Sequence, residues 1–415
     1  MKQGNAHQSF DELDRIIRDQ AEKKLDVVVD VKDVQFLPAT IGEDFDPEWG
    51  GLSPSIGRGL ERKMVVKLPP TGDKKMLLDI SPKAMDDIAT YTHTPSRYIN
   101  YMAKEKEYSL IATNLNTWFQ NADPKRSRRM LRAWKGDGFT GSANVMSGKL
   151  RSLVSDQYMR IDNELLFDVV KPVLDELHSM GIDIASMNCN EDFFNLKLTC
   201  PRLRREVKVG DVVEAGLRFK NSETGLSYFL MDDFLNRLTC LNGCVSGTRI
   251  SDGIKKRHRG GRYPIGILPQ YLDDKDAYST YVTELRKDIT KMIKQCLSDE
   301  RFEKIVEGLR VTAHVDTTIK HLDVIERGKV RTIPALELVD NEWGISSADK
   351  KSIVHHLHND RDYTQWGFAN AITRTANDHS SYDEATRLEE IGGKILAFHP
   401  RQWQVYQNAE FKEAA

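Results

Sequence analysis

Five short segments rich in apolar residues follow one another between residues 182 and 241, and polar turn residues separate them. Their length and composition are typical of β-strands. The turn Asn221-Ser222-Glu223-Thr224-Gly225 favours a hairpin, because Asn and Gly tolerate the positive φ angles that such loops require. The pattern therefore predicts an antiparallel sheet. Its expected strands are residues 182–187, 193–199, 213–220, 226–232 and 237–241.

Helical patterns are expected on both sides of this sheet. Residues 9–24 predict an amphipathic helix that leads into a strand. Ser81-Pro82 and Thr94-Pro95 each combine a capping residue with a proline suited to the first turn, so a short helix is expected after each. Residues 109–113 are expected to form a strand. After Pro269 long charged helices are expected at residues 277–297, 300–309, 346–358, 364–376 and 382–396.

The expected fold class is α+β, with a central antiparallel sheet packed by helices and a mostly helical C-terminal region. A chain of 415 residues is longer than the roughly 250–300 residues that one core supports, so several regions are expected. We assign residues 1–108 to an N-terminal helix and strand region. Residues 109–268 form the β-rich centre with a basic loop, and residues 269–415 form the helical end.

The composition is that of an ordinary folded protein, with 40% hydrophobic and 29% charged residues. The longest apolar runs, at 25–31 and 165–174, are shorter than the roughly 20 residues of a membrane helix. Residues 1–10 are polar and do not resemble a secretory signal. We therefore expect a cytoplasmic protein without a membrane partner. Five cysteines, an odd number, favour free buried thiols over disulfides.

Motifs of several enzyme classes are missing from the sequence. It contains neither the glycine motifs of nucleotide-binding enzymes nor G-x-S-x-G. Cys240, Cys244 and His258 lack the second ligand pair of a zinc finger. The histidines at positions 355, 356 and 358 lack the H-E-x-x-H pattern. We therefore expect no metal and no cofactor, and favour a binding protein over an enzyme.

A run of cations without an acid is the most distinctive chemical feature of the chain. Aromatic residues flank it at Trp118, Phe119 and Trp134. Single-stranded nucleic acid needs this combination, because bases stack on aromatic rings while guanidinium groups bind phosphate. The alternative is a solvated charged face or an oligomer contact. The cations of this run are Lys125, Arg126, Arg128, Arg129, Arg132 and Lys135.

Two further basic clusters follow. The first, Arg202, Arg204, Arg205 and Lys208, lies between two expected strands. The second lies after Arg249 in a loop whose glycines let backbone amides approach an anion. We expect Arg249 and this loop to contact nucleic acid. The loop is Lys255-Lys256-Arg257-His258-Arg259-Gly260-Gly261-Arg262.

Several stretches together resemble the phage/plasmid-like protein family, which is described as domain of unknown function 932. The resemblance covers about residues 82–396 and implies a mobile-element setting. It transfers no catalytic residue, because the family has no established activity. The stretches that carry it are residues 151–158, 161–164, 219–225, 237–243, Arg257-His258, 366–373 and 388–393.

The leading hypothesis is a phage or plasmid DNA-metabolism protein that binds single-stranded nucleic acid, as an oligomeric annealing or recombination protein. Two alternatives remain open. One is a metal-dependent nuclease or nucleic-acid-modifying enzyme that uses Asp156, Asp232, Asp233 and Glu223. The other is an interaction protein that blocks host defence. For Asn221 and Gly225 we favour a structural role in the hairpin loop over a contact with ligand.

Overall fold

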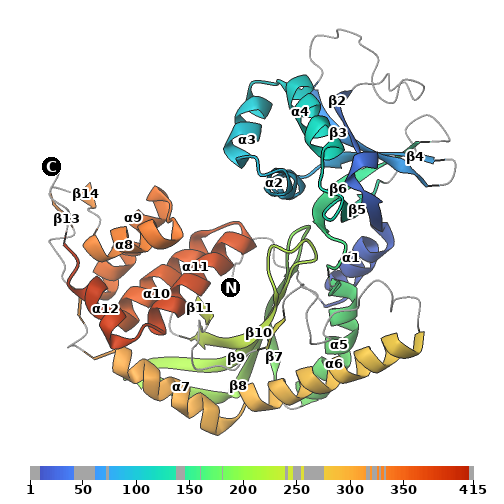
Figure 1. The fold of residues 1–415 in the computed structure, drawn as a ribbon. Coiled ribbons are helices and arrows are strands. Elements are labelled where there is room, and N and C mark those ends of the chain that lie inside the picture. Colours follow the sequence, from blue (N-terminus) through green and yellow to red (C-terminus); the bar gives the residue numbers. More distant parts are fainter. Residues whose placement is uncertain are drawn as a thin grey trace.

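In the residues that it describes, the computed structural model in Figure 1 comprises two large β-sheets, a small two-stranded sheet and a set of C-terminal helices. The expected α+β class is confirmed. The residues that the structure describes are 10–41, 61–71, 74–136, 145–158, 160–179, 181–238, 242–245, 254–256, 275–314, 318–319, 325–326, 329–330 and 333–410.

The N-terminal sheet has the strand order β1-β5-β6-β4-β3-β2, and all neighbours are antiparallel except β4 and β6. Helices α2, α3 and α4 lie together on one side of it (Figure 1). Phe36, Leu78, Leu115 and Phe119 belong to the core between them. The strands are β1 (Lys24–Asp30), β2 (Gln35–Ile41), β3 (Glu61–Thr71), β4 (Lys74–Ile80), β5 (Arg128–Lys135) and β6 (Val145–Ser155). The helices are α2 (Pro82–Tyr91), α3 (Ser96–Lys104) and α4 (Tyr108–Gln120), with a short 3-10 turn η1 (Val31–Asp33).

Two local expectations about this region had different outcomes. The cap at Ser81 is confirmed, because its side chain accepts a hydrogen bond from the backbone N of Ala84 and Pro82 begins α2. The strand expected at residues 109–113 is wrong, because α4 includes them. Ile111, Leu115 and Phe119 are buried at helical spacing. The burial of this apolar helical face therefore outweighs the strand preference of the β-branched residues at 109–113. The sheet also extends to Ser155, whereas the expected first region ended at residue 108.

The second sheet has the order β11-β10-β9-β8-β7, with β12 also paired to β10, and every pairing is antiparallel. The antiparallel sheet expected from the turn at 221–225 is therefore confirmed. Its strands are β7 (Asp183–Cys189), β8 (Phe194–Lys208), β9 (Asp211–Asn221), β10 (Phe229–Arg237), β11 (Asn242–Val245) and β12 (Ile254–Lys256). The helices that share its core are α1 (Phe10–Lys23), α5 (Asn163–Ser179), α6 (Lys275–Cys296) and α7 (Asp299–Thr312).

Apolar and charged side chains alternate along β8, so the two faces of this sheet differ in polarity. Leu196 and Leu198 belong to the apolar core shared with α5, α6 and α7. Lys197 lies between them in sequence and forms a fully buried ion pair with Glu389 of α11. Because successive side chains of a strand point to opposite faces, the helical C-terminal region packs on the face opposite the apolar core.

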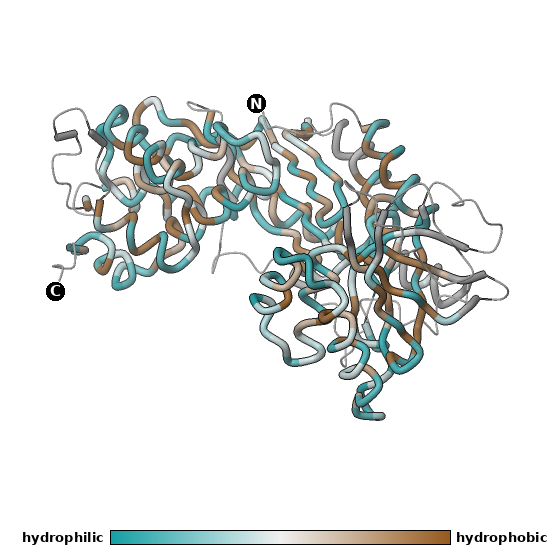
Figure 2. Tube along the Cα trace, turned by 90° about the horizontal axis from the view of Figure 1, so that it is seen from above, coloured by the Kyte–Doolittle hydropathy of each residue, from teal (hydrophilic) through white to brown (hydrophobic). Residues whose placement is uncertain are grey.

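The C-terminal helices have their own core around Trp403, Phe368 and Leu388. Figure 2 shows hydrophobic and hydrophilic residues alternating along them, as expected for helices with one buried face. These helices are α8 (Pro334–Trp343), α9 (Ser347–Asp360), α10 (Gln365–Thr375), α11 (Tyr382–Leu396) and α12 (Pro400–Gln407). Short elements accompany them, namely β13 (Ile325–Glu326), β14 (Lys329–Val330) and the 3-10 turn η4 (Ala376–Asp378).

Candidate nucleic-acid interface

The exposed cations Lys125, Arg126 and Arg128 lie where the chain turns from α4 into β5. Asp123 shapes this turn, because its carbonyl accepts from the backbone N of Arg126 at 2.8 Å. Its Oδ1 atom accepts from the backbone N of Lys125 at 3.0 Å. The hydroxyl of Ser127 donates to Asp30 of β1 at 2.8 Å and fixes the end of the turn. The cations are therefore held on an ordered turn beside the N-terminal sheet.

A small pocket of about 230 Å³ brings Arg126 together with Trp118, Tyr91 and His93. Trp118, on α4, is 36% exposed. Nη1 of Arg126 lies 3.1 Å from Nε2 of His93. The guanidinium carbons of Arg126 and Arg129 lie 5.8 and 4.8 Å from the centroid of the Tyr91 ring. The pocket thus combines exposed aromatic surface with positive charge, and we call it the Trp118 pocket.

Acidic and phenolic groups in and beside the Trp118 pocket have defined partners. Burial raises the pKa of the Tyr91 phenol above its ordinary value, although Arg129 and Arg126 act in the opposite direction. Its neutral hydroxyl donates to the carbonyl of Arg126 at 3.3 Å. Hydrogen bonds from the backbone of Lys32 and from Ser127 hold the pKa of Asp30 below its ordinary value. Asp123 is the acidic side chain in the pocket wall.

Arg132 is not part of this surface, although the sequence placed it among the nucleic-acid contacts. It is only 1% exposed. Its guanidinium donates to Asp26 at 3.1 Å, to Asp162 at 2.7 Å and to the carbonyl of Glu223 at 2.7 Å. A guanidinium with this many protein acceptors has no free donor face for a phosphate. Arg132 therefore has a structural role, because β5 alternates and turns it towards the second sheet.

Trp134 is also held by the protein itself. It is half-buried, and the guanidinium carbon of Arg151 lies 4.0 Å from its ring centroid. Within the described residues, its buried Nε1 atom has no hydrogen-bond partner. One face of this ring is occupied by Arg151. Of the two tryptophans selected from the sequence, Trp118 is the one that lines a pocket together with an exposed guanidinium, that of Arg126.

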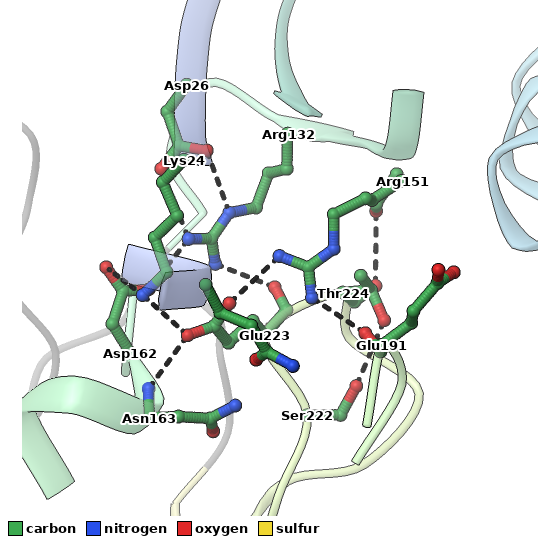
Figure 3. A network of polar contacts seen from close by, with 12 residues as sticks. Lys24, Asp26, Arg132, Arg151, Asp162, Asn163, Glu191, Ser222, Glu223 and Thr224 are labelled. Atoms are coloured by element: carbon green, nitrogen blue, oxygen red, sulfur yellow. Dashed lines mark hydrogen bonds and ion pairs between the residues drawn. The ribbon is translucent and has the colours of Figure 1, made fainter. Parts of the chain in front are cut away.

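The buried side of β5 leads to a polar network between the two sheets, which we call the junction (Figure 3). Glu223, from the loop between β9 and β10, receives Nζ of Lys24 at 2.7 Å and Nη1 of Arg151 at 2.9 Å. Its Oε1 atom also accepts from the backbone N of Asn163 at the start of α5, at 2.8 Å. Residues 151–158, 161–164 and 219–225 therefore meet at Glu223.

Electrostatics hold the junction in its ionised form. Burial alone raises the pKa of Glu223, but Lys24, Arg151 and Arg132 outweigh burial and hold that pKa below its ordinary value. The same balance lowers the pKa of Asp162, where Arg132 and Lys24 are the main positive neighbours. These acids remain charged because buried cations surround them.

Gly225 and Asn221 stabilise the turn at residues 221–225 in different ways. Gly225 adopts φ +82°, as the hairpin prediction required. Asn221 instead ends β9, and its Nδ2 atom donates to the carbonyl of Ile161 and to Oδ1 of Asn163, both at 2.8 Å. The side chain of Asn221, rather than its φ angle, ties the loop to the start of α5.

The structure describes only part of the other basic clusters. Arg249 and residues 257–262 lie outside the described residues, as do Cys240 and His258. Lys255 and Lys256 belong to β12, whose backbone pairs with β10. In β8, Arg204, Arg205 and Lys208 form ion pairs with Glu214, Asp299, Glu303 and Asp362.

The acids considered for a nuclease lie at different places in the fold, and three of them pair with different cations. Asp232 pairs with Arg218, and Asp233 with Arg301. Glu223 lies in the junction, whereas Asp156 follows β6. In the part of the chain that the structure describes, no group of three or more metal-ligating side chains is brought together.

Sequence reasoning missed Tyr91 and His93. Tyr91 ends α2 and His93 follows with φ 56°, which turns the chain towards the Trp118 pocket. The hydroxyl of Tyr91 bonds to a residue 35 positions away, so no local pattern identifies it. Tyr98 is a further exposed aromatic residue, and its hydroxyl accepts from Nδ2 of Asn114, one turn before Trp118.

Comparisons with known proteins add no further evidence. No protein-family model matches the chain, and neither the curated proteins nor the solved structures yield a match. Among the described helices, none is long and apolar enough to cross a membrane.

Proposed function

We propose that this protein binds single-stranded nucleic acid at the Trp118 pocket and the adjoining cations Lys125, Arg126 and Arg128. The observation that carries the proposal is the position of Trp118 beside the guanidinium of Arg126 in one pocket. An exposed indole offers a stacking surface to any base, and neighbouring guanidinium groups bind phosphate. Binding of this kind tolerates any sequence, because it uses ring faces and the backbone rather than base edges.

The unpaired state of these cations among the described residues also favours phosphate binding at this surface. Lys125, Arg126 and Arg128 are exposed and have no ion pair with another described residue. Phosphates would therefore not have to displace an acidic partner. The acid nearest in sequence, Asp123, already accepts the backbone N of Lys125.

We further propose that the protein acts in the cytoplasm on DNA of a phage or plasmid, as a homo-oligomer that promotes annealing or recombination. The resemblance to the phage/plasmid-like family supports the setting. Oligomerisation would place several copies of a small binding surface on one strand and increase its avidity. Light scattering with and without oligonucleotide tests this part, and a strict monomer under both conditions would contradict it.

The experiment that tests binding compares salt dependence in two matched variants by fluorescence anisotropy of labelled oligothymidylate. Arg126→Ala/Arg128→Ala removes two cations beside the pocket. Lys351→Ala/Arg401→Ala removes two exposed cations from the C-terminal helices. If both cations contact phosphate, the first variant should flatten the slope of log affinity against log salt by roughly 1.4. The second should retain the parental slope. Equal slopes in the two variants would contradict the proposal.

A further inference from the structure

A second positively charged surface lies at the elbow between α6 and α7. It is an open groove of about 1020 Å³. In Figure 1, α7 and α4 lie at opposite ends of the molecule, so this groove is separate from the Trp118 pocket. Its cations are Arg286, Lys287, Lys291, Lys294, Arg301 and Lys304. We call it the α6–α7 groove.

The helical period of α6 places its cations on one exposed face. Leu285, Ile289 and Ile293 are buried in the core of the second sheet. The four cations of α6 lie on the remaining surface, where all are exposed. None of these four forms an ion pair with another described residue. Their charge is therefore available to a ligand.

The α7 wall is fixed by neighbouring groups. Nη2 of Arg301 donates to Oδ2 of Asp233 at 3.1 Å, and Asp233 is only 2% exposed. The Ser298 side chain caps α7 by accepting from the backbone N of Arg301. Glu300, the acidic residue of the wall, pairs with Lys304. The wall therefore adds little unpaired negative charge to the groove.

The chemistry of the lining favours a nucleic-acid backbone over a protein segment. Among the described residues of the lining, Met292 is the apolar side chain and none is aromatic. Protein interfaces rely on aromatic anchors and are depleted in lysine. Phosphate contacts instead use Lys and Arg together with neutral donors such as Ser, Thr and Gln. Thr290, Gln295 and Ser298 supply such donors.

We infer that the α6–α7 groove binds the sugar–phosphate backbone of a second nucleic-acid strand. This inference rests on the proposed function and extends it, because annealing requires that one assembly hold two strands. Since none of the described lining residues is aromatic and the four cations of α6 are exposed, the groove recognises phosphates and leaves the bases free to pair. Binding in the groove is accordingly independent of the bases.

The test uses an abasic phosphodiester oligonucleotide, which has phosphates but no bases. Lys287→Ala/Lys291→Ala/Lys294→Ala removes groove cations, and Arg15→Ala/Lys351→Ala/Arg401→Ala removes three exposed cations elsewhere as the control. The groove variant should bind the abasic oligonucleotide at least about tenfold more weakly than the control at low salt. Native mass spectrometry with short oligothymidylates should show one strand fewer per chain in the groove variant.

Each other outcome overturns a definite part of the account. Unchanged abasic binding and unchanged stoichiometry in the groove variant would overturn the groove assignment alone. Loss of oligomers by light scattering, with both strands still bound, would make the groove a contact between copies and also overturn it. If Arg126→Ala/Arg128→Ala binds normally and only the groove variant loses binding, the Trp118 pocket is not a binding site. The assignment of the α6–α7 groove would then be supported. Absence of binding by the parent protein would overturn both.

Discussion

Nη1 of Arg151 lies 2.9 Å from Oε2 of Glu223, and this contact joins the N-terminal sheet to a loop of the second sheet. Arg151 lies on β6 of the N-terminal sheet, whereas Glu223 lies in the loop that joins β9 to β10. Both side chains are at most 3% exposed. The junction is therefore a buried electrostatic contact between the two sheet regions.

Glu223→Gln should destabilise the protein by about 3–5 kcal/mol at neutral pH, because it removes the buried negative charge that Lys24 and Arg151 share. Urea unfolding followed by circular dichroism measures this loss. Glu300→Gln is the matched control, because Glu300 pairs with Lys304 on the surface. A Glu223→Gln midpoint equal to that of the parent would show that the junction is not held by this charge.

Acid should weaken the junction in a defined pH range. The pKa of Glu223 is lower in the folded protein than its ordinary value of 4.5, so its contribution is complete above that pH. The contribution is lost as the pH falls further towards the folded-state pKa. Unfolding midpoints from neutral pH down to about pH 3 should therefore fall less in Glu223→Gln than in the parent. Parallel pH profiles would contradict the lowered pKa.

Arg132→Met should destabilise the protein by about 3–5 kcal/mol, because Asp26 and Asp162 would then lose their buried cation. The folded fraction should bind oligothymidylate with the parental salt slope, since Arg132 has no free face for phosphate. Calorimetric melting gives the first quantity and anisotropy the second. A stable variant with a flatter salt slope would restore Arg132 to the nucleic-acid surface.

Gly225→Val should cost about 1–3 kcal/mol in unfolding free energy, because valine is strained at φ +82°. The Cβ position itself has room, since Tyr158 is the nearest neighbour at 3.6 Å. Backbone conformation rather than a clash is then the cause. Gly225→Asn should cost less, because asparagine adopts positive φ more readily. Equal melting of Gly225→Val and the parent, together with lost binding, would identify the turn as a ligand contact.

The sequence predicted the fold class and the antiparallel sheet because local signals specify hairpins and strand alternation. The prediction for Arg132 was wrong because acids that are distant from it in the sequence lie beside it in the fold. The partners Asp26 and Asp162 lie 106 and 30 residues away from Arg132. Long-range pairing of β5 with β1 brings Asp26 into register with Arg132. The grouping of Trp118 with Tyr91 likewise depends on packing of α4 against the end of α2.

The row of cations on α6 could have been predicted from the sequence. Arg286, Lys287, Lys291 and Lys294 recur at helical spacing opposite Leu285, Ile289 and Ile293. Acids at Glu284 and Asp288 interrupt the run, so a search for acid-free clusters passes over it. Helical periodicity of charge, rather than its local density, would have identified this surface.

The central claim is that bases stack on Trp118, and a comparison of two ligands tests it most directly. Affinities for oligothymidylate and for an abasic oligonucleotide of equal length are measured by anisotropy for the parent, Trp118→Ala and Leu110→Ala. Leu110 is an exposed apolar residue of the same helix and serves as the control.

Trp118→Ala should weaken oligothymidylate binding by about 5- to 160-fold, which corresponds to about 1–3 kcal/mol for one stacked base. Abasic binding should change little, and Leu110→Ala should resemble the parent with both ligands. If Trp118→Ala weakens both ligands equally, or neither, the indole does not stack on a base and the account of the Trp118 pocket is contradicted.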